Sequence, residues 1–286
     1  YHEQGRVGLV LRRINQRILS IEELGLPPQI KELATRQRGL IILAGPTGSG
    51  KSPSLAAMIE HRNRTTPGHI ITIEDPIEYL YKPSRCIITQ REIGIHTPGW
   101  KTAVQNSMRQ SSDVVCIGEV RNEESMEYAL QLAQTGRLCI FTLHASKAPQ
   151  AIERIINFYQ ENRRLQVLTD LAMNLAGIIT QRLVIKKDGS HTAITDFMLN
   201  SPAIQDLIFK GELLELRDVM ARDNTEGMHT FDQNLFELYS KGDISSTEAL
   251  RHADSPHELE MHIHLHEEGG TTNQIYNRIS DLNLIT

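Results

Sequence analysis

The sequence predicts an α/β fold in which a parallel sheet is covered by helices on both faces. Continuous apolar runs alternate with helical patterns between Gly39 and about Tyr159, and strands buried on both faces have such sequences. A glycine-rich loop follows the first run directly, as in a phosphate-binding strand–loop–helix unit. The expected strands are Leu40–Ala44, Ile70–Ile73, Val114–Ile117 and Leu138–Leu143.

Composition limits the class of protein. The chain has 286 residues, of which 40% are hydrophobic and 23% charged, and its formal net charge is -5. This is enough for one sizeable core, or for one core and a smaller helical domain. The acidic balance offers no general attraction to a phosphate backbone, so nucleic acid is not an expected partner. No apolar run approaches the roughly 18 residues of a membrane-spanning helix, so we expect a cytoplasmic protein that reaches a membrane only through partners.

The N-terminal stretch differs from the rest of the chain. Val7–Arg13 resembles a strand in composition, and Ser20–Glu23 looks like the start of a short helix with the serine as N-cap. The chain begins at Tyr1 rather than at a methionine, and the first strand has no partner nearby. We therefore expect residues 1–25 to be the remnant of an N-terminal domain and its linker.

The loop after the first strand carries the strongest motif. Its residues fit the pattern G-x-x-x-x-G-K-[ST] and are Gly45, Pro46, Thr47, Gly48, Ser49, Gly50, Lys51 and Ser52. The glycines let backbone N–H groups turn inward around an anion, and the following helix adds its positive N-terminal end. Lys51 is expected to reach the β- and γ-phosphates of ATP, and Ser52 to ligate Mg²⁺.

Pro53 follows this motif and alters it. Proline has no N–H, and it disfavours helical dihedral angles at the preceding Ser52. The missing donor would face the α- and β-phosphates, so we expect Pro53 to weaken nucleotide binding.

Acidic residues follow the second predicted strand. Glu74, Asp75 and Glu78 lie at its carboxyl end, where ligands of open α/β sheets bind. Three neighbouring acids with no basic residue between them repel one another unless they share a cation. A Mg²⁺–ATP complex supplies that cation, so Glu74 and Asp75 are expected on the metal side; a solvated acidic turn is the alternative.

The next two strands also end in polar residues. Val114–Ile117 is followed by Gly118 and Glu119, as in a Walker B segment, and Glu119 is expected to orient or deprotonate the attacking water. An ordinary helix cap is the alternative. Arg121 would serve a neighbouring phosphate or pair with Glu123. His144 ends the last strand at the edge that carries the phosphate loop, which favours sensing of the γ-phosphate over a purely structural role.

The second half of the chain has a different pattern. Two amphipathic stretches, Leu183–Lys187 and Thr192–Leu199, predict a pair of strands, and short helical patterns follow from Ser201. These patterns are broken by Gly211, Gly227, Gly242 and Pro256. The His-rich Met261–His266 alternates like a strand or an extended tail and lacks the spacing of a metal site, so metal binding is a minor alternative. The three cysteines lie in apolar stretches and are expected to be buried thiols.

Together these motifs resemble a known family. The phosphate loop, Ile73–Glu78, Gly118–Arg121 and Thr142–His144 resemble the secretion-type ATPases of type IV pili and type II secretion, and are similar to PilT/PilU-like retraction motors. Gly227–Gln233 and Ala249–Ser255 look closer to the PilU type than to PilT. The resemblance covers most of residues 7–268.

The resemblance implies a RecA-like P-loop NTPase core over residues 26–200 and a C-terminal helical domain over 201–268. It also implies a truncated, PAS-like N-terminal portion, and 269–286 would be a flexible tail. Glu78 and Glu119 match the catalytic carboxylates of relatives. In the family, arginines of the N-terminal domain reach the nucleotide of the neighbouring subunit, and Arg12 is the best match to one of them. A surface position on an edge strand is the alternative for Arg12.

The implied function is that of an ATP-hydrolysing subunit of a homo-hexameric motor for type IV pilus retraction and twitching motility. Its cofactors would be ATP and Mg²⁺, and its partners a PilT-like motor and a pilus platform protein of the inner membrane. One alternative is a nucleotide-binding accessory subunit with little hydrolysis of its own, which supports a PilT-like motor. A RecA-like DNA translocase is a further alternative, disfavoured because no basic strand studded with aromatic residues is present.

Overall fold

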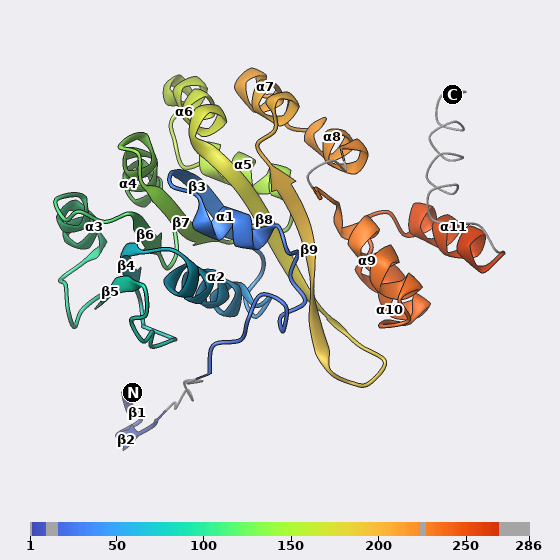
Figure 1. The fold of residues 1–286 in the computed structure, drawn as a ribbon, viewed down its shortest axis with the longest axis horizontal. Coiled ribbons are helices and arrows are strands. Elements are labelled where there is room, and N and C mark those ends of the chain that lie inside the picture. Colours follow the sequence, from blue (N-terminus) through green and yellow to red (C-terminus); the bar gives the residue numbers. More distant parts are fainter. Residues whose placement is uncertain (1, 10–16, 224–226, 269–286) are drawn as a thin grey trace.

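A seven-stranded sheet forms the centre of the molecule (Figure 1). The computed structural model describes residues 2–9, 17–223 and 227–268. The strand order is β5-β4-β6-β7-β3-β8-β9, and neighbours run parallel except for the antiparallel pair β8 and β9. The strands are β3 (Gly39–Ala44), β4 (Gly68–Glu74), β5 (Cys86–Glu92), β6 (Val114–Ile117), β7 (Leu138–Leu143), β8 (Leu175–Ile185) and β9 (His191–Leu199), and a two-stranded sheet of β1 (His2–Glu3) and β2 (Arg6–Val7) precedes them.

Helices cover both faces of the sheet, as predicted. Helices α1 and α2 pack together on one face, and α3 to α6 lie on the other (Figure 1). Within the described ranges, no helix is both long and apolar enough to span a bilayer. The bounds are α1 (Ile30–Thr35), α2 (Lys51–Thr65), α3 (Trp100–Met108), α4 (Glu123–Gln134), α5 (Ala148–Ile156) and α6 (Glu161–Asn174).

The four predicted core strands are confirmed as β3, β4, β6 and β7, and β6 and β7 have the predicted bounds. Every residue of β3, β6 and β7 is buried. Their continuous apolar sequences follow from this, because both faces of each strand are covered by helices. The three cysteines are buried free thiols, as expected.

Strand β5 was missed by the sequence analysis. It lies at the edge of the sheet beside β4, and within it only Cys86 is fully buried. An edge strand is exposed on one side and needs no continuous apolar run, so the pattern used for the core strands does not detect it. The predicted pair of strands after residue 180 is present, but β8 begins at Leu175, well before the predicted Leu183.

The helix predicted to start at Ser20 is wrong. Residues 21–25 form a turn, although the cap contacts exist: the Ser20 N–H donates to Glu23 Oε2 at 2.8 Å, and the Glu23 N–H donates to Ser20 Oγ at 3.1 Å. The turn ends at Gly25, whose φ is +70°, and two prolines follow, so a helix cannot continue. The predicted strand Val7–Arg13 meets β2 only at Val7, and residues 10–16 lie outside the described residues.

Short helices occupy the C-terminal part, with breaks where they were predicted. Gly211 caps α7 with a φ of +78°, and Pro256 begins α11. Helices α7 and α8 pack into the main core, whereas α9 to α11 share a second core with Val184 and Ile194 from β8 and β9. The bounds are α7 (Pro202–Lys210), α8 (Leu216–Arg222), α9 (Phe231–Ser240), α10 (Ser246–His252) and α11 (Pro256–Glu267).

The domain boundaries after residues 25, 200 and 268 stay predictions, and residues 269–286 lie outside the described residues.

The extended conformation predicted for the His-rich segment is wrong, because Met261–His266 belongs to helix α11. Leu259 and Ile263 are its buried residues, and their spacing of four places them on one helix face. The rings of His262 and His266 lie against Phe236, at centroid distances of 5.8 and 5.7 Å. In the described part of the chain, no group of three or more His, Cys, Asp or Glu side chains is arranged to hold a metal.

Phe197 provides a test of the main core. It lies on β9 and is 0% exposed, whereas Phe209 on α7 is 52% exposed. Truncation of a buried phenylalanine removes apolar contacts and leaves a cavity, so we expect Phe197→Ala to lower the free energy of unfolding by about 3–5 kcal/mol. The matched control Phe209→Ala should change it by less than about 0.5 kcal/mol. Urea denaturation followed by circular dichroism measures both, and equal losses would contradict the assignment of Phe197 to the core.

Candidate functional site

The register of the sheet brings the ends of four strands together. Ile73 on β4 lies beside Ile117 on β6, which lies beside Phe141 on β7, and Phe141 lies beside Ile42 on β3. The loops after these strands therefore open at one edge of the sheet, around a pocket of about 850 Å³. Side chains and backbone from all four loops line it, including Thr47, Gly48, Gly50, Lys51, Ser52, Pro53, Glu74, Asp75, Glu78, Glu119, Arg121, Thr142 and His144.

The glycine-rich loop has a conformation that requires glycine. Gly45 has a φ of +151°, and a Cβ atom there would lie 2.6 Å from the carbonyl oxygen of Gln181 on β8. Gly50 caps helix α2 in the left-handed region, with a φ of +93°. The Gln181 Nε2 atom on β8 donates to Ser54 Oγ on α2 at 2.8 Å. This hydrogen bond connects β8 to the first turn of the helix that follows the loop.

Three residues of the motif do not line the pocket. They are Gly45 and Ser49, which are buried, and Pro46, which is exposed to solvent. Ser49 is 3% exposed, and its hydroxyl has no hydrogen-bond partner among the described residues. The remaining residues of the motif line the pocket, and their contact with a nucleotide stays a prediction.

The Lys51 side chain makes hydrogen bonds to the backbone at the start of the loop. Its Nζ atom donates to the carbonyl oxygens of Gly45 and Pro46, each at 2.8 Å. Burial lowers the pKa of Lys51, and the negative charge of Glu119 opposes that shift. An entering anion would offer this ammonium group charged acceptors in place of neutral carbonyls, which makes the stronger hydrogen bond.

Pro53 does not disturb the helix as the sequence suggested. Helix α2 begins at Lys51 and includes Ser52, so the expectation that proline keeps Ser52 out of helical dihedrals is wrong. The first N–H groups of a helix have no partner within it, and the Ser54 N–H, at 3.1 Å from the Gly50 oxygen, is the first donor after the proline. Pro53 lines the pocket but has no backbone N–H. The pocket therefore has one hydrogen-bond donor fewer than it would have with another residue at position 53.

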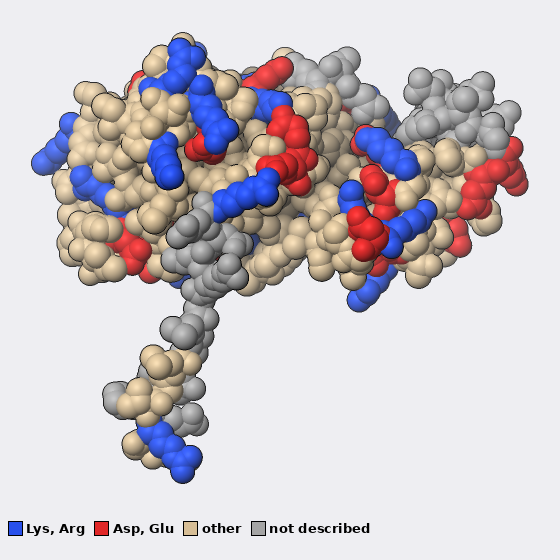
Figure 2. All heavy atoms as spheres, turned by 60° about the horizontal axis from the view of Figure 1, so that its bottom comes forward, with Lys and Arg blue, Asp and Glu red and all other residues tan. Residues whose placement is uncertain are grey.

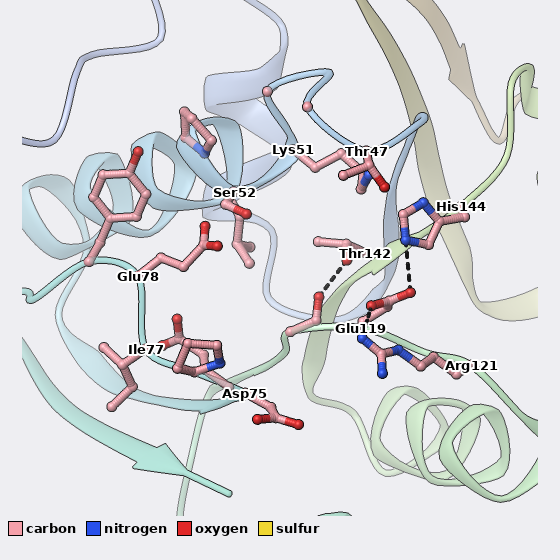
Figure 3. A pocket seen from close by; sticks show the side chains of 18 of the residues that line it. Thr47, Lys51, Ser52, Asp75, Ile77, Glu78, Glu119, Arg121, Thr142 and His144 are labelled. Atoms are coloured by element: carbon pink, nitrogen blue, oxygen red, sulfur yellow. Dashed lines mark hydrogen bonds and ion pairs between the residues drawn. The ribbon is translucent and has the colours of Figure 1, made fainter. Parts of the chain in front are cut away.

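The acids after β4 face the same pocket. Thr72 Oγ1 and Gln90 Nε2 donate to Glu74 Oε1 at 2.6 and 3.3 Å. Burial raises the pKa of Glu74, while these hydrogen bonds oppose the shift. Figure 3 shows the Glu78 carboxylate pointing toward Ser52 and the Asp75 carboxylate pointing away from it.

Glu119 is held by two side chains that carry nitrogen atoms. Its Oε1 atom lies 3.0 Å from His144 Nε2, and its Oε2 atom lies 2.6 Å from Arg121 Nη2 (Figure 3). Arg121 thus pairs with Glu119 and not with Glu123, whose partner is Arg163. The Glu119 side chain is 19% exposed, so the carboxylate is fixed in direction but still open to the pocket.

Two residues that sequence reasoning missed hold the acidic loop in place. Gln90 on β5 donates to the Tyr79 carbonyl oxygen at 2.8 Å and accepts from the Tyr81 N–H at 3.1 Å. Glu92 on the same strand accepts from the Ile77 N–H at 3.0 Å. Both belong to the undetected edge strand, in which the β-branched run Ile87–Thr89 is a local pattern that could have indicated it.

Arg12 lies outside the described residues, so its proposed contact with a neighbouring nucleotide stays a prediction.

A glycine-rich loop between a central parallel strand and a helix, faced by acids from the next strands, defines the class of P-loop nucleotide-binding proteins. A family model for type II/IV secretion system proteins matches residues 4–229. The chain therefore belongs to the type II/IV secretion system protein family.

Within this family, the chain is similar to individual ATPases of type IV pili. The chain is 49% identical to the type IV pilus ATPase PilU of Pseudomonas aeruginosa, over 94% of its own length and 70% of that protein. It is 35% identical to the retraction ATPase PilT of the same organism, over 90% of its length and 74% of PilT. A crystal structure of the pilus retraction motor PilT with bound ADP superimposes with a TM-score of 0.82 at 38% identity, covering 87% of this chain and 71% of that one. The expected resemblance to PilT/PilU-like ATPases, closer to PilU than to PilT, is confirmed.

The position of Pro53 leads to a test of nucleotide affinity. Replacement by threonine restores a backbone N–H at the pocket, and a hydrogen bond to a charged group contributes about 1.5–3 kcal/mol. We expect Pro53→Thr to bind ADP roughly ten- to hundredfold more tightly in isothermal titration calorimetry. Pro53→Ala is the matched control, because it restores the N–H without a hydroxyl and should give a similar gain. Unchanged affinity in both variants would remove the proposed role of Pro53.

Proposed function

We propose that this chain is an ATP-hydrolysing subunit of a hexameric motor that drives type IV pilus retraction. The observation that carries the proposal is a single pocket in which Lys51 and Ser52 of the phosphate loop face Glu78 and Glu119. These are the parts that phosphoryl transfer to water requires: a cradle for the phosphates and a carboxylate that orients the water. The likeness to PilU and PilT supports the pilus as the site of action.

In the proposed mechanism, the loop binds the phosphates first. Lys51 Nζ exchanges the carbonyl oxygens of Gly45 and Pro46 for phosphate oxygens, and the N–H groups at the start of α2 add a positive helix end. The phosphates are thereby held between the loop and the acidic side of the pocket. ATP is the substrate in this step, and ADP is the product that the loop continues to hold.

The residues present fit a magnesium ion that arrives with the nucleotide. Mg²⁺ takes oxygen ligands and is bound by one or two protein groups together with phosphates and water. The pocket offers the Ser52 hydroxyl and several carboxylates, while the described residues contain no cluster that would hold a metal by protein ligands alone. We assign Ser52 as the primary ligand, with Glu74 on the metal side; the expected role of Asp75 as a further ligand is not supported, because its carboxylate points away from Ser52 (Figure 3). The ion would neutralise charge that develops on the phosphates.

Glu119 is the proposed group that aligns the attacking water. Its two oxygens are oriented by Arg121 and His144, which leaves a carboxylate of fixed direction toward the pocket. Glu78, pointing toward Ser52 from the opposite wall (Figure 3), is the second proposed catalytic carboxylate. Because His144 contacts Glu119 directly, a γ-phosphate that attracts the imidazole would also change the position of the carboxylate, which is how His144 would sense the nucleotide.

The assembly belongs to the same proposal. A homo-hexamer would bring Arg12 of one subunit to the nucleotide of the next, and the motor would act in the cytoplasm on a pilus platform protein of the inner membrane, with a PilT-like motor as partner. A DNA translocase remains disfavoured: on the face shown in Figure 2, Lys and Arg are interspersed with Asp and Glu and form no continuous basic stripe.

An accessory subunit with little hydrolysis of its own is the second candidate. Pro53 favours it, because this residue removes a donor from the pocket, and so does the higher identity to PilU than to PilT. Phosphate release by the purified chain, alone and mixed with a PilT-like motor, separates the two candidates. A motor hydrolyses ATP alone; an accessory subunit changes turnover only in the mixture.

Replacement of Glu119 tests the hydrolytic site. We expect Glu119→Gln to retain ATP binding but to lower kcat by roughly 10²–10³, because an amide cannot accept the proton of the attacking water. Glu124→Gln is the matched control; Glu124 lies on the surface beside Lys101, at 3.7 Å, and its replacement should leave kcat unchanged. Phosphate release and nucleotide titration are measured on hexamers confirmed by light scattering. Turnover near the wild-type value in Glu119→Gln would refute the assignment.

A further inference from the structure

The loop after β7 joins the proposed site to the C-terminal helices. It starts at His144, which contacts Glu119, and ends at Lys147, the residue that precedes α5. Lys147 Nζ lies 3.0 Å from Asp254 Oδ2, and Asp254 stands between α10 and α11. One short segment therefore contacts the candidate catalytic carboxylate at one end and the C-terminal helices at the other.

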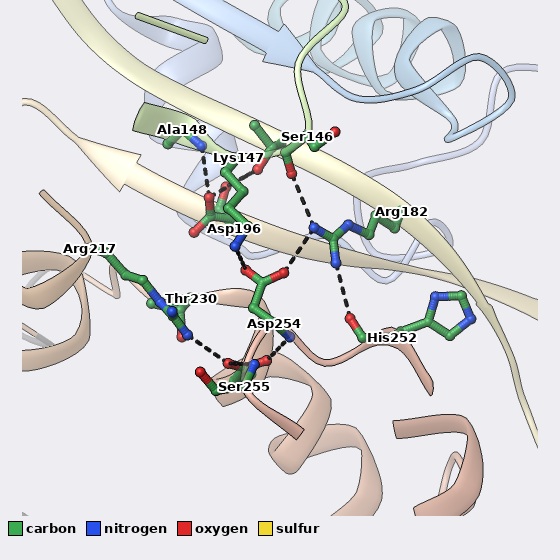
Figure 4. Close-up of polar contacts among 12 residues, drawn as sticks. Ser146, Lys147, Ala148, Arg182, Asp196, Arg217, Thr230, His252, Asp254 and Ser255 are labelled. Atoms are coloured by element: carbon green, nitrogen blue, oxygen red, sulfur yellow. Dashed lines mark hydrogen bonds and ion pairs between the residues drawn. The ribbon is translucent and has the colours of Figure 1, made fainter. Parts of the chain in front are cut away.

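Asp254 binds two cations that both come from the nucleotide-binding sheet and its loops. Besides Lys147, Arg182 of β8 lies with its Nη2 atom 3.0 Å from Asp254 Oδ1 (Figure 4). The Asp254 side chain is only 8% exposed, and a carboxylate at that depth is stable only when its charge is paired. Both oxygens of Asp254 are thus committed to groups outside the C-terminal helices.

Arg182 links the same two regions. Its Nη2 atom donates to the Ser146 carbonyl oxygen at 3.3 Å, and its Nη1 atom donates to the His252 carbonyl oxygen at 3.0 Å. The guanidinium carbon lies 4.1 Å from the centroid of the Phe231 ring on α9. A planar guanidinium that is stacked and hydrogen-bonded in this way has little freedom, so Arg182 fixes Ser146 relative to α9 and α10.

The position of Asp254 depends in turn on the C-terminal helices. Its N–H donates to Asp232 Oδ1 at 2.7 Å, the Ser255 N–H donates to Asp232 Oδ2 at 3.1 Å, and Arg217 of α8 pairs with Asp232 at 2.8 Å (Figure 4). The loop has a separate anchor in the sheet, where the Ala148 N–H donates to the buried Asp196 of β9 at 2.9 Å. A shift of α9 to α11 would therefore move the part of the loop between Ala148 and His144 while the start of α5 stays in place.

We propose that Asp254 is a positioning residue for ATP hydrolysis: through Lys147, Arg182 and Ser146 it fixes the loop that holds His144 against Glu119. This inference rests on the proposed function and adds a route by which the C-terminal helices control the hydrolytic step. Apolar packing of the second core holds these helices to β8 and β9 independently. The contacts of Asp254 therefore set the loop without being needed to keep the helices attached.

A second ion pair across the same boundary supplies a matched control. Lys186 at the end of β8 lies 3.5 Å from Asp243, which follows α9. This pair also joins the hairpin of β8 and β9 to the C-terminal helices, but neither residue contacts the loop after β7. Loss of an ion pair between these regions can thus be compared with loss of the contact to the loop.

The test compares Asp254→Asn with Asp243→Asn in the full chain. We expect Asp254→Asn to lower kcat by about ten- to a hundredfold, the scale of a small misplacement of catalytic groups, with KM for ATP changed by less than about twofold. Hydrogen exchange measured by mass spectrometry should rise at residues 144–148 in that variant. Asp243→Asn should leave both kcat and this exchange at wild-type values.

Two results would contradict the inference. Equal kcat in the two variants, or unchanged exchange at residues 144–148 in Asp254→Asn, overturns it. If Asp254→Asn does not fold, Lys147→Ala replaces it, because this variant removes the direct ion pair between Asp254 and the loop while Arg182 still pairs with Asp254; the same two readouts apply. If the wild-type chain hydrolyses no ATP, the proposed function fails, and the exchange comparison still shows whether Asp254 fixes the loop.

Discussion

The site depends on the register of four parallel strands. Ile42, Ile73, Ile117 and Phe141 lie side by side across the sheet, and the backbone hydrogen bonds that align them are buried. A different group begins within three residues of each: the phosphate loop, the acids from Glu74 to Glu78, Glu119 and His144. A shift of any one strand by a residue would turn its side chains to the opposite face. The backbone pairing of these strands therefore determines which side chains meet in the pocket.

Most of this arrangement could be predicted from the sequence, because it is local in origin. Strands covered on both faces are apolar throughout, so β3, β6 and β7 were found with nearly correct bounds. Parallel strands end at a common edge, which placed Glu74, Glu119 and His144 around one pocket. What could not be predicted is how these groups pair. The contact of Arg121 with Glu119 instead of Glu123 depends on the direction of the chain after Gly118, which no spacing reveals.

Most of the failures arose where tertiary context decided between two local possibilities, and one arose from neighbouring residues. Ser20 and Glu23 make the contacts of a helix cap, yet the following glycine and prolines stop a helix from forming. Met261–His266 alternates like a strand, yet burial of Leu259 and Ile263 on a second core makes it helical. Gln90 and Glu92 support the acidic loop from an edge strand that burial does not mark. In the second and third cases a distant part of the chain decided the outcome, whereas in the first the adjacent glycine and prolines did.

Strand β8 separates two sets of attachments on its opposite faces. Gln181 reaches Ser54 in the helix that begins at the phosphate loop, and its neighbour Arg182 reaches the carboxylate between α10 and α11. Successive side chains of a strand project in opposite directions, so these two layers hold one piece of backbone from either side. A displacement of β8 would therefore disturb the helix at the phosphate loop and the C-terminal helices at the same time.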